Sequence, residues 1–152
     1  MHAPFHRHTA TRAFAAAALV AGGLVAASAQ PAAAASECSN VVAGSGKATP
    51  LRDAAGRTVA TIWFHQRTSS PRGCYVLQAG LYRGTAHYMY LRICDSVTPL
   101  TGCTGWDAGN YKYFAGPINT DPICNSAVVK VHAPNGAVLF DRKISGLNDI
   151  CN

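Results

Sequence analysis

Residues 128–144, VVKVHAPNGAVLFDRKI, contain the feature that decides the fold. The dipeptide Asn135-Gly136 separates two runs rich in apolar and β-branched residues, Val128–His132 and Ala137–Ile144. Asn-Gly between such runs is the strongest short-range signal of a β-hairpin, because both residues tolerate the positive φ of a tight turn. The C-terminal part of the chain is therefore predicted to form two antiparallel strands.

Similar short runs, separated by turn residues, recur upstream of this hairpin. The predicted strands are residues 57–65, with 49–53 as a short hairpin partner, 74–82, 86–94 and 111–115. Residues 95–109 hold Pro99 and several glycines and are expected to form a loop, and irregular chain is expected around Gly116-Pro117 and Asp121-Pro122. Apolar residues recur at helical spacing in no long window. Six to eight short strands predict an all-β fold, a small antiparallel β-sandwich or barrel stapled by disulfides.

The predicted strand at 86–94 alternates clearly between two kinds of side chain. One face carries His87, Met89, Leu91 and Ile93, and the other carries Tyr88, Tyr90 and Arg92. Successive side chains of a strand point to opposite faces of a sheet. The first set is therefore expected in the core and the second set on the solvent side.

The first 35 residues have the three parts of a secretory signal peptide. Arg7 and Arg12 give a positively charged start, and an apolar run follows from Ala13 to Ala27. Small residues at Ala33-Ala34-Ala35 then suit the subsites of a signal peptidase. The apolar run is shorter than the roughly 20 residues of a membrane-spanning helix. We expect cleavage after Ala35, which leaves residues 36–152 as a single exported domain with no membrane span.

All cysteines of the chain lie in the part that would be exported. They are Cys38, Cys74, Cys94, Cys103, Cys124 and Cys151. An even number in a small exported domain predicts three disulfide bonds, and the absence of a C-x-x-C pair argues against a metal site. Many pairings are open to six cysteines. A bond between Cys94 and Cys103 is favoured because the segment between these two cysteines is short. A Cys38–Cys151 bond would tie the two chain ends together, and Cys74–Cys124 then follows by elimination.

The charge of the exported part is mildly positive and evenly spread. Without the leader, 11 basic residues face 7 acidic ones, and no short window gathers four basic residues. Nucleic-acid-binding domains concentrate Lys and Arg in one stripe, so no nucleic acid partner is expected. Non-specific attraction to an anionic cell wall or spore surface fits this charge.

Residues that could support catalysis form no motif. His65, His87 and His132 lie in predicted strands without a spacing that demands a metal ion. Asp95 and Asp107 are the one pair of loop carboxylates that could flank a glycosidic bond, and neither G-x-S-x-G nor H-E-x-x-H occurs. We expect a protein that is not an enzyme, with no catalytic residue, metal or cofactor.

Aromatic residues in the middle of the chain are the better candidates for function. A binding surface could be made from Trp106, Tyr88, Tyr90, Arg92, Tyr111 and Tyr113. The competing interpretation is packing within the core and between strands. Trp106 is the best candidate because the sequence places it in a Gly-rich loop, where packing in the core constrains side chains less.

The stretch Gly109–Pro117, GNYKYFAGP, resembles the D-S-G-x-[FY]-x-Y-Y-A-G-P-V segment of the actinobacterial spore-associated protein A family, with Asp107-Ala108-Gly109 standing where that family has Asp-Ser-Gly. Val59–Phe64 followed by the cysteine-led Gly73–Leu77, and Cys124 after the Ala-Gly-Pro motif, are similar to its pattern. The resemblance covers roughly residues 57–124. It does not extend to Cys94 and Cys103 or to the long C-terminal hairpin. It implies a small secreted protein found with the spore or cell envelope, and no catalytic residues.

The sequence therefore predicts a secreted, non-enzymatic protein associated with the spore or cell envelope. Its partner would be the cell wall, the spore surface or another secreted protein. The alternative is an extracellular binding module for a glycan or a protein, acting through exposed aromatics. A protease inhibitor is one form of that module, and it would use the loop between Cys94 and Cys103, which contains Thr98-Pro99-Leu100.

Overall fold

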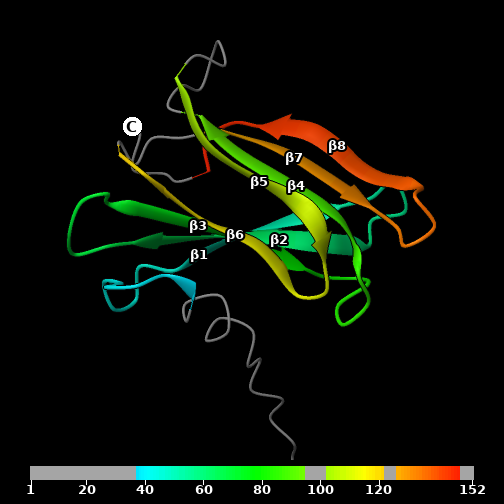
Figure 1. The fold of residues 1–152 in the computed structure, drawn as a ribbon, viewed down its shortest axis with the longest axis horizontal. Coiled ribbons are helices and arrows are strands. Elements are labelled where there is room, and N and C mark those ends of the chain that lie inside the picture. The colour runs from blue at the N-terminus through cyan, green and yellow to red at the C-terminus, as the bar shows by residue number, and fades with distance from the viewer. Residues whose placement is uncertain (1–36, 95–101, 122–125, 148–152) are drawn as a thin grey trace, which may run out of the picture.

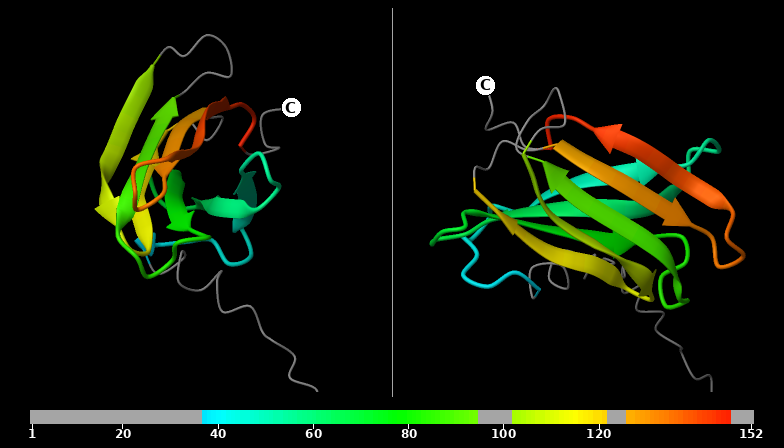
Figure 2. Two further views of the ribbon diagram at one scale, coloured as in Figure 1. Left: turned by 90° about the vertical axis from the view of Figure 1, so that its right-hand side faces the viewer. Right: turned by 45° about the horizontal axis from the view of Figure 1, so that its top comes forward.

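The computed structural model describes residues 37–94, 102–121 and 126–147. These residues form two four-stranded antiparallel sheets that pack face to face, as Figures 1 and 2 show. The predicted all-β fold is confirmed in its sandwich form, and no helix is among the elements of the described ranges. A search of the same ranges finds no helix long and apolar enough to span a membrane.

Eight strands make up the two sheets. They are β1 (Lys47–Arg52), β2 (Thr58–Gln66), β3 (Gly73–Ala79), β4 (His87–Cys94), β5 (Cys103–Tyr111), β6 (Phe114–Thr120), β7 (Ser126–His132) and β8 (Val138–Ile144). The N-terminal sheet has the order β1-β2-β3-β6 and the C-terminal sheet the order β5-β4-β7-β8. The chain therefore changes sheets after β3, after β5 and after β6.

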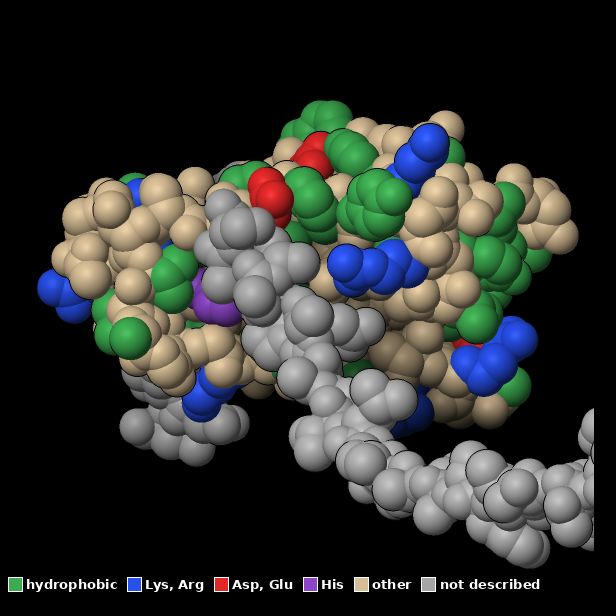
Figure 3. Space-filling model, turned by 90° about the horizontal axis from the view of Figure 1, so that it is seen from below, with side chains coloured by type: hydrophobic (Ala, Val, Ile, Leu, Met, Phe, Trp, Pro, Cys, Tyr) green, Lys and Arg blue, Asp and Glu red, His purple; other side chains and the backbone are tan. Residues whose placement is uncertain are grey.

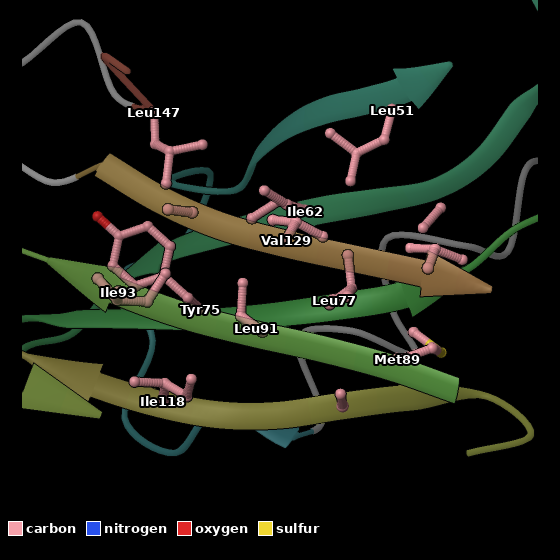
Figure 4. Close-up of a cluster of buried hydrophobic side chains, with 14 of the residues drawn as sticks. Leu51, Ile62, Tyr75, Leu77, Met89, Leu91, Ile93, Ile118, Val129 and Leu147 are labelled. Carbon is pink, nitrogen blue, oxygen red and sulfur yellow. The ribbon is translucent and has the colours of Figure 1, made fainter. Parts of the chain in front are cut away.

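The main core lies between the two sheets. The predicted alternation of β4 is confirmed, because Met89, Leu91 and Ile93 are fully buried while the residues between them face outward. Figure 4 shows Leu77 of the N-terminal sheet and Leu91 of the C-terminal sheet pointing into this common core. Full burial of each such side chain contributes about 1.5–3 kcal/mol to folding.

A second, smaller core lies on the outer side of the N-terminal sheet. Residues 37–46 cross that side, held by hydrogen bonds from Val42 N to Gln66 O and from Thr68 N to Asn40 O, both 2.8 Å. Beneath them lie Cys38, Cys74 and Val76, with Val41 and Phe114 packed against the group. Both faces of β3 are therefore covered, and all seven of its residues are buried.

The described disulfide bonds confirm one predicted pair and correct two. Cys94 is bonded to Cys103 as predicted, whereas Cys38 is bonded to Cys74. The predicted Cys38–Cys151 and Cys74–Cys124 pairs are wrong, because Cys74 faces outward from β3 directly beneath the segment that carries Cys38. Their Cα atoms lie 6.0 Å apart, a usual disulfide separation. Cys124 and Cys151 lie outside the described residues.

The predicted loop at 95–109 is wrong over its second half, which is strand β5. The glycines there are tolerated in a strand because neighbouring groups approach the backbone closely. A Cβ atom on Gly105 would lie 2.7 Å from Cγ2 of Ile118, and one on Gly109 would lie 3.1 Å from the Tyr111 ring. Gly105 is thus required by the approach of β6, and Gly109 by the ring of Tyr111 within β5 itself. Residues 95–101, which include Thr98-Pro99-Leu100, lie outside the described residues.

The strand predicted at 111–115 is displaced along the chain. The chain turns at Lys112 and Tyr113, and β6 runs through Gly116-Pro117, where irregular chain was expected. Proline is tolerated there because β6 is an edge strand of the N-terminal sheet, with one side free of ladder hydrogen bonds.

The hairpin predicted at 128–144 is confirmed as β7 and β8. Gly136 has a φ of 87°, the conformation for which glycine is suited. Oδ1 of Asn135 accepts a hydrogen bond of 3.1 Å from the backbone nitrogen of Ala137. Gly136 therefore takes the positive φ that the Asn-Gly signal predicts, whereas Asn135 does not and contributes through its side-chain acceptor.

Candidate binding face

The outer side of the C-terminal sheet carries most of the predicted binding residues. In an antiparallel ladder directly opposed residues share a face, and Trp106 opposes Arg92 while Lys130 opposes both Tyr90 and Asp141. We call this surface the aromatic face. Its members are Tyr88, Tyr90, Arg92, Trp106, Ala108, Asn110, Val128, Lys130, His132, Asp141 and Lys143.

Trp106 and the half-buried Tyr90 form an aromatic pair on the aromatic face. Trp106 lies on β5 with 67% of its surface exposed, although the sequence placed it in a loop. Its ring and that of Tyr90 are nearly parallel, at an angle of 19° with centroids 6.4 Å apart. Since opposed strands are joined by a rigid ladder, the two rings form a fixed apolar platform open to solvent.

Tyr88 and His132 form a second aromatic pair on the same face. Their ring centroids lie 4.9 Å apart at an angle of 47°, and both side chains are half-buried. His132 was not among the residues predicted for binding. It comes beside Tyr88 because β4 pairs with β7, and that pairing joins segments about 40 residues apart in the chain.

The charges of the aromatic face are mainly positive. Lys130 pairs with Asp141 across the β7–β8 ladder at 3.1 Å, which neutralises the single acid of this face among its described side chains. Arg92 and Lys143 are exposed, and neither has an ion pair among the described residues. On the side of the molecule seen in Figure 3, by contrast, Lys and Arg side chains are scattered singly.

Tyr111, a predicted binding residue, is engaged by a hydrogen bond within the protein. Its hydroxyl donates a hydrogen bond to Oδ1 of Asp107, and Oδ2 of the same carboxylate accepts one of 2.6 Å from the backbone nitrogen of Gly116. The bond to the carboxylate raises the pKa of Tyr111 to about 12. Asp107 thereby connects β5 to β6 at the point where the chain changes sheets. We call Asp107, Tyr111 and Gly116 the clasp.

The contacts of the clasp account for the residue types in the segment that carries the family resemblance. Gly116 has a φ of 99°, and a Cβ atom there would lie 2.9 Å from the carbonyl oxygen of Tyr75. Ala115 is fully buried opposite Leu77. The aspartate, glycine and tyrosine of this segment hold the chain in place where it passes from one sheet to the other. The motif by itself therefore indicates no catalytic function.

Tyr113 lies apart from the aromatic face. It occupies the turn between β5 and β6, is 52% exposed, and has the guanidinium of Arg83 5.9 Å from its ring centroid. The structure therefore brings together Trp106, Tyr88, Tyr90 and Arg92 of the predicted set, and leaves Tyr111 and Tyr113 outside.

The three strand histidines lie apart from one another. His65 is buried on the outer side of β2, stacked on Trp63 at 6.0 Å, and burial lowers its pKa below the usual value. His87 is buried, with Nδ1 2.8 Å from the carbonyl oxygen of Thr85. No group of three metal-ligating side chains occurs within the described ranges.

The predicted carboxylate pair is only half described. Asp95 lies outside the described residues, and both oxygens of Asp107 are engaged in the clasp. A carboxylate with both oxygens bonded in this way is held as a structural acceptor.

Comparison of the chain with protein-family models, with curated proteins and with solved structures gives no match in any of the three.

Proposed function

We propose that the exported domain is a non-catalytic binding protein of the spore or cell envelope, which attaches to glycans through the aromatic face. The observation that carries this proposal is the position of Trp106 on the outer side of the C-terminal sheet, where it is two-thirds exposed and stacked beside Tyr90. Sugar rings present flat C–H faces that stack on aromatic rings, and Trp106 offers such a ring with its apolar face open to solvent.

Secretion is supported by two independent features of the chain. The first 35 residues have the charge and hydropathy pattern of a signal peptide. The disulfide bonds of the domain, Cys38–Cys74 and Cys94–Cys103, form and persist in oxidising compartments outside the cytosol. The resemblance to the spore-associated family agrees with both.

Retention on insoluble glycans tests the binding proposal. Purified residues 36–152 are mixed with cell-wall polysaccharide, and the bound fraction is measured after sedimentation. Trp106→Ala is expected to lower the bound fraction at least several-fold, because it removes an exposed stacking surface, a kind of contact worth about 1–3 kcal/mol where nucleic-acid bases stack on aromatic rings. Tyr113→Ala is the matched control, since Tyr113 is similarly exposed but lies off the aromatic face.

Equal retention of the two variants would contradict the proposal. The folded state of each is checked by near-ultraviolet circular dichroism, so that loss of binding is not loss of structure.

Export itself is tested by sequencing the protein recovered from culture medium or envelope fractions. An N-terminus at Ser36 is expected. An uncleaved chain in the cytosol with free thiols would contradict both the leader assignment and the location.

Protease inhibition is a second candidate, favoured by the observed Cys94–Cys103 bond, which closes a short segment between β4 and β5. Titration of a subtilisin-like protease with the domain tests it. Dose-dependent inhibition that is lost in the Cys94→Ser/Cys103→Ser variant would support this function over glycan binding.

A further inference from the structure

We infer that the ligand of the aromatic face is an acidic polysaccharide, in which sugar rings alternate with carboxylate or phosphate groups. The inference rests on the proposed function and adds the chemical class of the glycan. It is carried by the arrangement of cations beside the aromatic platform.

One row of cross-strand neighbours contains both an aromatic and two cations. Trp106 on β5 opposes Arg92 on β4, Arg92 opposes Val128 on β7, and Val128 opposes Lys143 on β8. Neighbouring strands are about 4.8 Å apart, so the two cations are separated by two strand spacings, or about 10 Å. A polymer that stacks one ring on Trp106 and runs across the strands therefore passes Arg92 and then Lys143.

In the next row the one negative charge is paired with a cation. Ala108, Tyr90, Lys130 and Asp141 follow one another across the sheet. Asp141 is held by Lys130 at 3.1 Å, so the described side chains of the aromatic face sum to an excess of two positive charges. Charge complementarity of this kind selects an acidic partner and speeds its encounter.

The spacing favours a polysaccharide over a nucleic acid. Two cations about 10 Å apart neutralise few phosphates, and nucleic acid affinity comes mainly from many such contacts. A sugar polymer with one acid per ring or per repeat needs only a few contacts, because stacking on Trp106 and Tyr90 supplies the rest.

The test compares two forms of one polymer. Polygalacturonate and its fully methyl-esterified form share a backbone and differ in charge, and affinity electrophoresis of residues 36–152 in gels containing either polymer gives the two dissociation constants. At low salt the acidic form is expected to bind about tenfold more tightly, because two exposed ion pairs are gained. The difference should vanish in 1 M NaCl, where the Debye length falls to about 3 Å.

Two double variants test whether the preference for the acidic form comes from the cations of the Trp106 row. Arg92→Gln/Lys143→Gln is expected to remove the difference between the two affinities by lowering the affinity for the acidic form. Arg72→Gln/Arg83→Gln removes the same charge from exposed positions outside the aromatic face, and it should lower the affinity for the acidic form less than about twofold by the general field of the molecule.

The outcomes separate this inference from the proposed function. If both polymers bind equally, or if the two double variants lose the same affinity, the acidic-ligand inference is overturned while glycan binding stands. If neither polymer retards the protein, this inference is overturned, and the sedimentation test with cell-wall polysaccharide decides separately whether glycan binding stands. Tighter binding of a single-stranded oligonucleotide than of polygalacturonate would overturn the inference in favour of a nucleic acid ligand.

Discussion

Asp107 shows how one side chain can fix a change of sheets. Its two oxygens accept hydrogen bonds from the Tyr111 hydroxyl and from the backbone nitrogen of Gly116. Hydrogen bonds to a charged acceptor contribute about 1.5–3 kcal/mol each, more than those between neutral groups. The clasp is therefore expected to stabilise the domain more than any exposed ion pair.

Replacement of the carboxylate measures that contribution. Asp107→Asn is expected to lower the free energy of unfolding by about 2–3 kcal/mol in urea titrations. It should also lower the pKa of Tyr111 from about 12 toward its ordinary value of 10.0, a change visible in the ultraviolet absorbance of tyrosinate. Asp141→Asn, which breaks the exposed pair with Lys130, should cost less than about 1 kcal/mol. Similar losses in the two variants would contradict this role of Asp107.

His65 is the residue from which we expect a pH dependence of stability. Its burial lowers the pKa in the folded protein relative to the unfolded chain. The unfolded chain therefore takes up the proton first, so stability is complete above the ordinary value of 6.5 and falls as the pH drops from there through the lowered pKa. His65→Phe keeps a ring beside Trp63 and removes the titration. Between pH 7 and 5 the wild type should lose more unfolding free energy than this variant, and parallel curves would contradict the prediction.

The strands differ in how much of them can be predicted from the sequence. β4 and the β7–β8 hairpin are predicted because alternation and an Asn-Gly turn are local signals. β5 is missed because its glycines resemble those of a loop, whereas Gly105 is required by a contact with Ile118 of β6 that only the folded chain creates. For the same reason the outward side of β4 predicts Tyr88, Tyr90 and Arg92 as a group, whereas the places of His132 and Lys143 depend on the β4–β7 and β7–β8 pairings.

Strand β6 depends on a glycine where it approaches β3. Gly116→Ala would combine an unfavourable φ with a Cβ atom 2.9 Å from the Tyr75 carbonyl oxygen. Gly84→Ala is the matched control, because Gly84 has a similar φ of 92° with no atom within 4 Å of the added carbon. The strain of φ alone costs about 1–2 kcal/mol. Gly116→Ala should lose clearly more stability in urea unfolding, and equal losses would show that β6 can move away from β3.

For the whole molecule, the two described disulfide bonds are expected to contribute unequally. Cys38–Cys74 has a sequence separation of 36 residues and Cys94–Cys103 one of 9. Loop entropy assigns about 4 kcal/mol to the first and about 2.6 kcal/mol to the second. Cys38→Ser/Cys74→Ser should therefore lower the urea midpoint further than Cys94→Ser/Cys103→Ser, and it also frees the segment that covers the smaller core. The reverse order would contradict the loop-entropy account.

The pairing of the cysteines is the part of the architecture least open to prediction from sequence. Nothing in the chain near Cys38 signals that residues 37–46 cover the outer side of β3, so tying the chain ends was the simpler expectation. With Cys38 bonded to Cys74 and Cys94 to Cys103, we predict a third bond between Cys124 and Cys151. Peptide mapping under non-reducing conditions should find that link and no free thiol, and a free Cys124 would contradict it.

The order of the described disulfides along the chain has a consequence for biosynthesis. Each bond joins a cysteine to the next one in the sequence, 38 to 74 and 94 to 103. A chain that is threaded through a translocation pore from its N-terminus presents each pair before the next pair emerges. An oxidase working at the exit, which bonds the latest cysteine to the one before it, thus makes the native pairs in succession. If the domain is exported as we propose, its maturation should require an oxidase and no disulfide isomerase.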